Sequence, residues 1–251
     1  MIDISLEGNV AVATMRHSKA NAMDIEFCEA IAARFEELKQ SKAKAVVLVG
    51  EGKIFSAGVD LVRALEGGAD YFRRFLPALS KAFITAFFFP KPLVAAVNGH
   101  AIAGGCVLAC CADRRLMAKG TARIGIPELL VGVPFPTIAL EVMRFTVAAR
   151  FIQDVFLTGA TYLPEEALPR GLADEIVEPG DLMRRAIAAA EHFAAIRTEA
   201  FAITKLQLRQ PVADRCVSET QRFEAAVNEL WSAPEAFERI RAYVSRTFKK
   251  V

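Results

Sequence analysis

The sequence has 251 residues, of which 53% are hydrophobic and 24% charged, and its formal net charge is +2. This length and composition are typical of a folded protein with a substantial core, and they exclude a disordered chain. Lysines and arginines are dispersed rather than clustered, so no nucleic-acid-binding surface is expected, although a local basic patch for a phosphorylated ligand stays open.

No export signal or membrane segment is expected. The opening residues, MIDISLEG, lack a basic segment followed by an apolar one. The longest apolar run, 101–112, is far shorter than the roughly 20 residues that a helix needs to cross a bilayer. The sequence therefore predicts a soluble, cytoplasmic protein with no membrane partner.

The first part of the chain predicts a hairpin, a helix and a buried strand. Residues 1–15 alternate between apolar and polar positions around Gly8-Asn9, as a β-hairpin does. Apolar residues recur at helical spacing over 25–39, directly after Asp24, which is placed to cap the first turn. The uninterrupted apolar run Ala45–Val49 is typical of a strand that is buried on both faces of a parallel sheet.

The middle of the chain predicts alternating helices and strands. Phenylalanines and leucines recur every three or four residues over 71–89, which predicts a helix that starts or kinks near Pro77. The pattern then predicts, in order, a strand, a helix, a strand and a helix, at 93–97, 101–112, 114–118 and 137–144.

The end of the chain, from about Asp181, has a helical pattern throughout. We therefore divide the chain into a sheet-containing body, 1–190, and a helical region, 191–251.

The five cysteines are an odd number, and three of them fall in one apolar segment, so a disulfide framework is not expected. Cys106 and Cys110 have the i,i+4 spacing of two ligands on one helical face, but no His, Asp or Glu accompanies them. Buried thiols acting as small apolar side chains are favoured, and no metal ligand is predicted.

Two glycine-bearing turns follow the two best buried strands, at 55–60 and at 98–106. Ligands of α/β proteins bind at such strand ends, but neither turn matches a dinucleotide or nucleoside triphosphate motif. Glycine lets backbone N–H groups approach a ligand closely, and two of them converging on one oxygen would form an oxyanion hole. On local sequence alone, an oxyanion hole and a pair of ordinary turns both stay open.

Three segments resemble the signature blocks of the crotonase, or enoyl-CoA hydratase/isomerase, superfamily. They are KAVVLVGEGKIFSAGVDL, KPLVAAVNGHAIAGGCVLACCAD and IGIPELLVGVPFP. Residues 19–23, 157–159, 170–174 and 231–246 resemble further landmarks of the family in the same order, so the resemblance covers nearly the whole chain. The motifs around the second glycine turn are most similar to the mitochondrial-type Δ3,Δ2-enoyl-CoA isomerase branch.

The resemblance implies an α/β fold: a crotonase (ClpP-like) spiral of ββα repeats, with a C-terminal helical trimerisation region. It implies homotrimers or hexamers and an acyl-CoA thioester substrate in fatty acid metabolism. Coenzyme A is part of that substrate, so no separate cofactor is expected. The helix over 71–89 would shape the acyl pocket, although most of its phenylalanines are expected in the core or at trimer contacts.

The resemblance also assigns the site. The backbone N–H groups of Val59 and Gly104 would form the oxyanion hole for the thioester carbonyl, which gains negative charge when an enolate forms. The remaining substrate-binding residues that it implies are Lys19, Ala20, Ala22, Ala57, Gly58, Asp60, Leu61, Gly105, Val107, Pro127 and Phe135.

The sequence departs from the family's hydratases at one position. Those enzymes carry one glutamate in the helix after the glycines and a second in the Pro-Glu turn, whereas this chain has Val107 and Glu128. Hydration uses two carboxylates, while moving a double bond needs only one that takes a proton from C2 and returns it at C4. A pocket formed by Ile126, Leu130 and Phe135 is expected to raise the pKa of Glu128. The alternative is that Glu128 only caps or solvates a turn.

Other polar residues are weaker candidates. Asp60 is expected to brace its loop, and His100 to be structural rather than catalytic. Arg63, Arg246 and Lys249 are candidates for the phosphates of coenzyme A, the last two across a subunit boundary.

The sequence therefore predicts an enoyl-CoA isomerase with Glu128 as its single acid/base. A hydratase, a decarboxylase or thioester hydrolase of the same family, and a non-catalytic acyl-CoA-binding protein are the alternatives.

Overall fold

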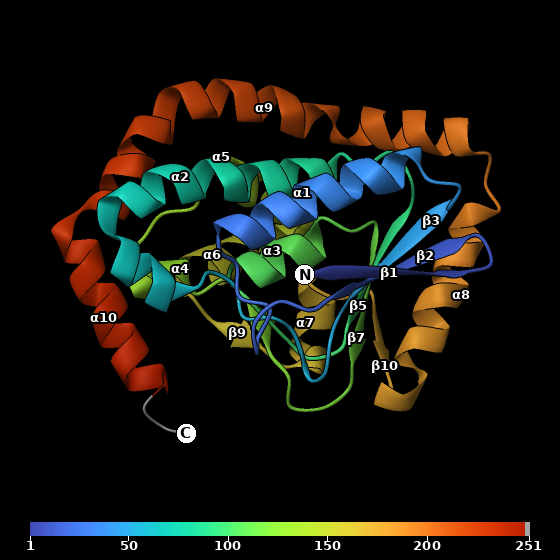
Figure 1. Ribbon diagram of the computed structural model, residues 1–251, viewed down its shortest axis with the longest axis horizontal. Coiled ribbons are helices and arrows are strands. Elements are labelled where there is room, and N and C mark those ends of the chain that lie inside the picture. The colour runs from blue at the N-terminus through green and yellow to red at the C-terminus, as the bar shows by residue number, and fades with distance from the viewer. Residues whose placement is uncertain (249–251) are drawn as a thin grey trace.

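The computed structural model describes residues 1–248 (Figure 1). Its larger sheet has six strands in the order β1-β2-β3-β5-β7-β10. The hairpin β1 (Ile2–Glu7) and β2 (Val10–Met15) is antiparallel, and the remaining strands are parallel: β3 (Ala45–Gly50), β5 (Leu93–Val97), β7 (Arg114–Ala118) and β10 (Glu175–Val177). The predicted hairpin and buried strands are confirmed.

A smaller sheet has the order β4-β6-β8-β9. Its strands are β4 (Ile54–Ser56), β6 (His100–Ile102), β8 (Ile124–Gly125) and β9 (Thr161–Tyr162). Three of them directly follow β3, β5 and β7, and they stack in the same order. Each repeat thus places one strand in each sheet before its helix, which is the predicted spiral of ββα units.

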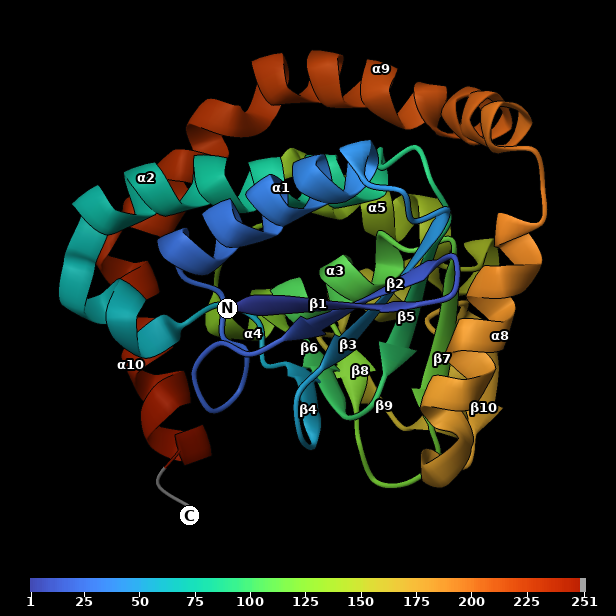
Figure 2. The ribbon, with the colours of Figure 1, turned by 45° about the vertical axis from the view of Figure 1, so that its right-hand side comes forward.

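The two faces of the larger sheet explain the uninterrupted apolar sequence of β3. Val46 and Leu48 point into the main core, while Ala45 and Val47 point to the opposite face, which α8 (Leu182–Ala194) covers. Helices α1 (Ile25–Gln40) and α2 (Leu61–Phe87) lie over the main core (Figure 2). Asp24 caps α1, since its side chain accepts a hydrogen bond from the N–H of Phe27.

Two predicted boundaries were wrong. Helix α2 begins at Leu61 and contains Pro77, and its break lies at Gly68, where φ is +63° and ψ is −159°. Such angles are accessible essentially only to glycine, so the Gly67-Gly68 pair was the signal to follow. The predicted helix 101–112 is split into β6 and α3 (Gly104–Cys110), because residues from 100 to 102 pair with β4 and β8.

Short elements follow: α4 (Glu128–Val131), α5 (Thr137–Thr146), α6 (Ile152–Leu157) and α7 (Pro164–Ala167). The C-terminal part is helical as predicted, with α8, α9 (Thr198–Ser232) and α10 (Pro234–Phe248). Helix α9 crosses above α1 and α2, and α10 turns down beside α2 and α4 (Figure 1). The predicted boundary at residue 190 falls within α8, and the division into two domains stays a prediction.

Candidate active site

The two glycine turns meet in space. A Cβ built on Gly58 would lie 2.5 Å from the carbonyl oxygen of Ile102 and 3.2 Å from the nitrogen of Gly104. Gly58 also has φ of +80°, a conformation that favours glycine. The turn after β4 and the start of α3 therefore approach more closely than any side chain at residue 58 would permit.

Pairing with an earlier segment sets the direction of the Val59 amide. Val59 forms a parallel bridge with Met23, in which the Met23 N–H donates to Gly58 and the Asp60 N–H donates to the Met23 carbonyl. On this side of the bridge the hydrogen bonds are made by Gly58 and Asp60, which flank Val59, so the N–H of Val59 points away from Met23. Within residues 1–248 it has no hydrogen-bond acceptor.

The Gly104 amide is free for a different reason. It belongs to the first residue of α3, where N–H groups have no partner inside the helix, and no other acceptor is present in the described part of the chain. Ala103 immediately before it has φ of +52° and ψ of −126°, a strained conformation for a residue with a Cβ. This strained turn brings the Gly104 nitrogen next to Gly58, where a Cβ would lie only 3.2 Å from it.

Glu128 is the first residue of α4, and its carboxyl group is buried. The residue is 8% exposed, and its Oε2 atom has no hydrogen-bond partner among the described residues. Burial raises the pKa of Glu128 to about 8, against the opposing effect of a hydrogen bond from its own backbone N–H. A buried carboxyl group with a free oxygen and a pKa near neutrality is suited to take up and return a proton.

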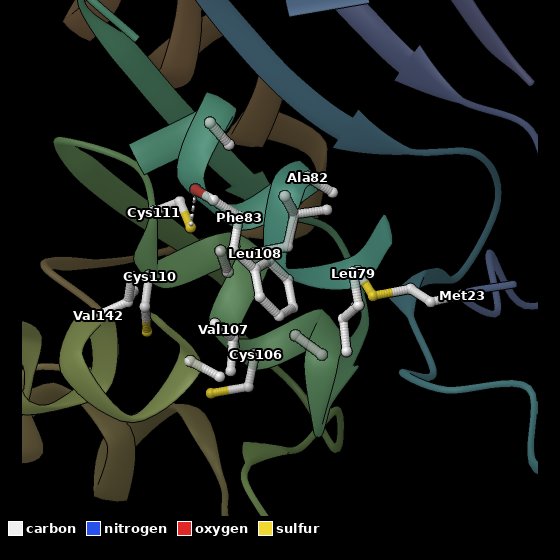
Figure 3. Packing of buried hydrophobic residues seen from close by; sticks show 14 of the residues in the cluster. Met23, Leu79, Ala82, Phe83, Cys106, Val107, Leu108, Cys110, Cys111 and Val142 are labelled. Carbon is white, nitrogen blue, oxygen red and sulfur yellow. Dashed lines mark hydrogen bonds between the residues drawn. The ribbon is translucent and has the colours of Figure 1, made fainter. Parts of the chain in front are cut away.

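Helix α3 supplies no second carboxylate. Its sequence is GGCVLAC, and Val107 is 1% exposed within the core. The close-up in Figure 3 shows Cys106 and Val107 near the start of α3 and Cys111 just past its end, with the Phe83 ring of α2 packed against the helix. Burial raises the pKa of the Cys106 thiol, and the nearby charge of Glu128 adds to this.

The predicted substrate-binding residues occupy connected segments. Ala57 donates its N–H to the carbonyl of Ala20, so the 19–23 segment lies beside the Gly58 turn, with Lys19 exposed and Ala22 half-buried. Gly105 packs on β4, since a Cβ there would lie 2.3 Å from the Ser56 carbonyl oxygen.

Further predicted residues flank the two turns. Asp60 caps α2 by accepting the N–H of Arg63, as its predicted bracing role requires, and Leu61 follows it. Pro127 precedes α4 at its N-cap position. Phe135 lies on an apolar groove of about 630 Å3 that α5, α6 and α9 also line.

The three residues predicted to form a pocket around Glu128 differ in burial. Ile126 and Phe135 are buried, but Leu130 is 54% exposed and packs over Gly159. Burial of Glu128 therefore comes from other neighbours as well, among them Cys106 of α3.

The remaining polar candidates have the following positions, and one of them, Arg63, is already hydrogen-bonded within the protein. Arg63 donates to the carboxylates of Asp24 and Glu26, at 2.7 and 2.6 Å. His100 is exposed, and its Nδ1 accepts the N–H of Arg123, in agreement with a structural role. Arg246 is near the end of α10, and Lys249 is outside the described residues.

His17 and Asn21 are features that the sequence analysis missed. The His17 ring is 2.8 Å from the Asp24 carboxylate and stacks on Phe27, with ring centroids 4.7 Å apart. Asn21 has φ of +48°, and its side chain donates to the Phe55 carbonyl. Asparagine is tolerated in left-handed backbone, which was the only local signal. Both residues fix the 19–23 segment against the Val59 turn.

The cysteines are free thiols, and those at 28, 106, 110 and 111 are buried, as predicted. Among residues 1–248, no three His, Cys, Asp or Glu side chains gather in an arrangement suited to a metal ion. No helix in the same range has both the length and the apolar character needed to span a membrane.

Comparison with known proteins places the chain in a family. A family model described as enoyl-CoA hydratase/isomerase matches residues 5–246, and the chain therefore belongs to this family. A putative enoyl-CoA hydratase of Thermus thermophilus is 34% identical over 204 residues, which is 79% of this chain and 80% of the relative. Mitochondrial enoyl-CoA delta isomerase 1 of Rattus norvegicus is 27% identical over 218 residues, covering 86% and 75% of the two chains.

The fold is the crotonase fold. The crystal structure of human mitochondrial delta3-delta2-enoyl-CoA isomerase superimposes with a TM-score of 0.93 at 24% identity, covering 99% of this chain and 98% of that chain. At this identity the likeness concerns the fold alone.

Proposed function

We propose that the protein shifts the double bond of a 3-enoyl-CoA to give the 2-enoyl-CoA, with Glu128 as the single acid/base. The observation that supports this most strongly is a buried Glu128 carboxyl group whose Oε2 atom has no hydrogen-bond partner among the described residues, together with an α3 helix that contains no acid. The amides of Val59 and Gly104, which have no acceptor within residues 1–248, supply the expected place for the thioester carbonyl oxygen.

The proposed reaction is a balanced 1,3-proton transfer. The ionised Glu128 carboxylate removes a proton from C2, and the electron pair moves onto the thioester oxygen to give a dienolate. The two amides donate hydrogen bonds to that oxygen, each contributing roughly 3 kcal/mol to transition-state stabilisation in comparable sites. Glu128 then returns the proton to C4, the double bond lies between C2 and C3, and the carboxylate is regenerated. The reaction needs no separate cofactor.

Two substrates separate this function from the main alternative. Purified protein is incubated with 3-hexenoyl-CoA and with crotonyl-CoA, and formation of the 2-enoyl product or loss of the conjugated double bond is followed. We expect the wild type to isomerise the first substrate and to hydrate the second only poorly. Glu128→Gln should lose isomerisation, whereas Glu29→Gln, the same change on an exposed carboxylate of α1, should retain it.

Four other results would contradict the proposed isomerase activity or the role of Glu128. Efficient hydration of crotonyl-CoA would favour the second candidate, a hydratase, which the similarity to the Thermus protein keeps in consideration. Equal isomerisation by Glu128→Gln would refute the role of that residue. Binding of acyl-CoA with no turnover would favour the binding protein, and loss of the acyl group or of carbon dioxide would favour a hydrolase or decarboxylase.

The pH dependence gives a further test of the base. Because the pKa of Glu128 is raised to about 8, the ionised form that removes the proton is the minor form at pH 7. We expect kcat/KM for 3-hexenoyl-CoA to rise with pH and to level off above about 8.

We also propose that the chain assembles as a homotrimer or hexamer. Several apolar side chains of α9 are exposed in the isolated chain, among them Leu206, Val217 and Phe223. Exposed apolar surface of this kind is typical of protein interfaces. Light scattering coupled to size-exclusion chromatography should give a mass of three or six chains, and a monomer would exclude the proposal.

A further inference from the structure

The helix that carries Glu128 is too short to hold itself in place. Helix α4 has four residues, and isolated helices of that length are not stable. Its end is tied back by local hydrogen bonds, since Gly132 donates to Leu129 and Val133 donates to the carbonyl of Glu128 itself. The position of the Glu128 backbone therefore depends on where residues 133 and 134 are held.

Trp231 holds that segment from the C-terminal region. It is the only tryptophan in the sequence, is 2% exposed, and lies at the end of α9. Its indole N–H donates to the Pro134 carbonyl at 2.8 Å, next to Val133. Its ring packs on Phe72 of α2, with centroids 5.1 Å apart, so the indole is held by a ring contact as well as by that hydrogen bond.

Helix α10 packs against the same, C-terminal, end of α4. Gly132 ends α4 with φ of +86°, and a Cβ there would lie 2.3 Å from Cδ of Arg239. Phe237 of α10 packs on the same Phe72 ring, with centroids 5.6 Å apart. In Figure 1 α9 ends and α10 descends directly beside α4, so both contacts come from one corner of the fold.

We infer that the corner between α9 and α10 is a clamp that positions Glu128, with Trp231 as its central positioning residue. The inference rests on the proposed function only in taking Glu128 as the acid/base. Trp231 itself does not touch the reacting atoms in this arrangement, because it acts through Pro134 and Val133.

The clamp predicts an electrostatic consequence as well as a geometric one. The charged or titratable groups near this region include the Cys106 thiol from α3 and Arg239 from α10. Glu141 and Arg144 of α5 and Glu219 of α9 line the groove that Leu129 and Pro134 also line. None of these groups lowers the pKa of Glu128, which burial raises. If the Trp231 hydrogen bond is lost, α4 gains freedom, water reaches the carboxyl group, and the pKa of Glu128 should fall toward its ordinary value.

Trp231→Phe tests the clamp through activity. The phenyl ring retains packing on Phe72 but removes the N–H donor. We expect kcat for 3-hexenoyl-CoA to fall roughly 10- to 100-fold with little change in KM, and the midpoint of the pH profile to move to lower pH. The matched control is Phe193→Leu, a loss of an aromatic ring from a half-buried side chain of α8, on the opposite side of the fold from α10 in Figure 1, which should leave both properties unchanged. A folded Trp231→Phe protein with an unchanged pH midpoint would overturn the inference, whether or not kcat falls.

Fluorescence tests the clamp without activity and without the risk of misfolding. All tryptophan emission comes from Trp231. We expect the emission of the wild-type protein to change between pH 6 and pH 9 with a midpoint near that of Glu128, and this change to be absent from Glu128→Gln. Identical titrations in the two proteins, or none in the wild type, would overturn the inference. If the wild type does not isomerise 3-enoyl-CoA, the proposed function fails while this titration still decides the clamp.

Discussion

Gly58 and Gly104 face each other so closely that a Cβ on the first would lie 3.2 Å from the backbone nitrogen of the second. The same Cβ would lie 2.5 Å from a carbonyl oxygen of the neighbouring turn, and neither of these backbone atoms moves without moving α3. The distance between the two free amides is thus controlled by the absence of a side chain.

Gly58→Ala should therefore separate the two amides. We expect kcat for 3-hexenoyl-CoA to fall about 10²-fold, the loss seen when one oxyanion donor is removed. Gly52→Ala is the matched control, because Gly52 also has positive φ, +71°, but a Cβ there would meet nothing within 4 Å. Both substitutions strain the backbone. The predicted oxyanion hole is therefore supported only if Gly58→Ala loses activity in steady-state kinetics and Gly52→Ala does not. Equal activity in the two variants would contradict it.

The raised pKa of Glu128 should also appear in stability. Below about pH 4.5 both folded and unfolded chains are protonated at this residue, and between 4.5 and about 8 only the folded chain retains the proton. The free energy of unfolding contributed by this group therefore falls as pH rises through that window, by roughly 2–5 kcal/mol in total.

Glu128→Gln removes this dependence. We expect the variant to be more stable than the wild type at pH 8.5 and to gain much less at pH 5, as measured by urea unfolding at the two pH values. Glu29→Gln should follow the wild type at both. A stability difference that does not change with pH would show that the Glu128 carboxyl group is solvated in the folded chain.

Features set by neighbouring residues were predictable from sequence. The apolar run of β3 and the cap of α1 by Asp24 depend on local pattern and on one side chain, and both are confirmed. The break in α2 at Gly68 was not predicted because the break was assigned to Pro77, since proline commonly interrupts helices. In the structure Pro77 lies within the helix. The short strand β6 was missed because its partners in β4 and β8 are distant in sequence.

The candidate site also depends on contacts between residues that are distant in the sequence. The glycines at 58 and 104 and the glutamate at 128 stand out in the sequence, but the close approach of the two glycine turns depends on the stacking of successive repeats. Burial of Glu128 and the contact of Trp231 with Pro134 bring together residues that are far apart in the chain. Local pattern contains no information about such contacts, so only the resemblance to a family suggested the grouping of the first three.

Val107→Glu should introduce the carboxylate that α3 lacks. Val107 is 1% exposed, so the change buries an acid and should lower the free energy of unfolding by about 1–3 kcal/mol or more. We expect hydration of crotonyl-CoA to rise above the wild-type rate, because two carboxylates can then divide water activation and proton delivery. Val107→Gln controls for the polar side chain without the acid and should not hydrate. Equal hydration by the two variants would contradict the role assigned to this position.

The attachment of α9 to the body depends on one partly buried carboxylate. Asp113 accepts hydrogen bonds from Lys205 at 2.7 Å and from Arg209 at 2.8 Å, and both cations are buried. Asp113→Asn leaves these two charges without a counter-ion, which should cost about 3–5 kcal/mol of unfolding free energy.

Urea unfolding of Asp113→Asn, with Asp214→Asn on the exposed side of α9 as its control, measures this cost. Burial lowers the pKa of Lys205 to about 8, and Asp113 opposes that shift. Combining Asp113→Asn with Lys205→Met removes one of the stranded charges, so the double variant should be more stable than Asp113→Asn alone. If the losses of unfolding free energy in Asp113→Asn and Lys205→Met simply add in the double variant, the carboxylate and the ammonium group do not interact. The attachment of α9 to the body would then be attributed to Arg209 and apolar packing.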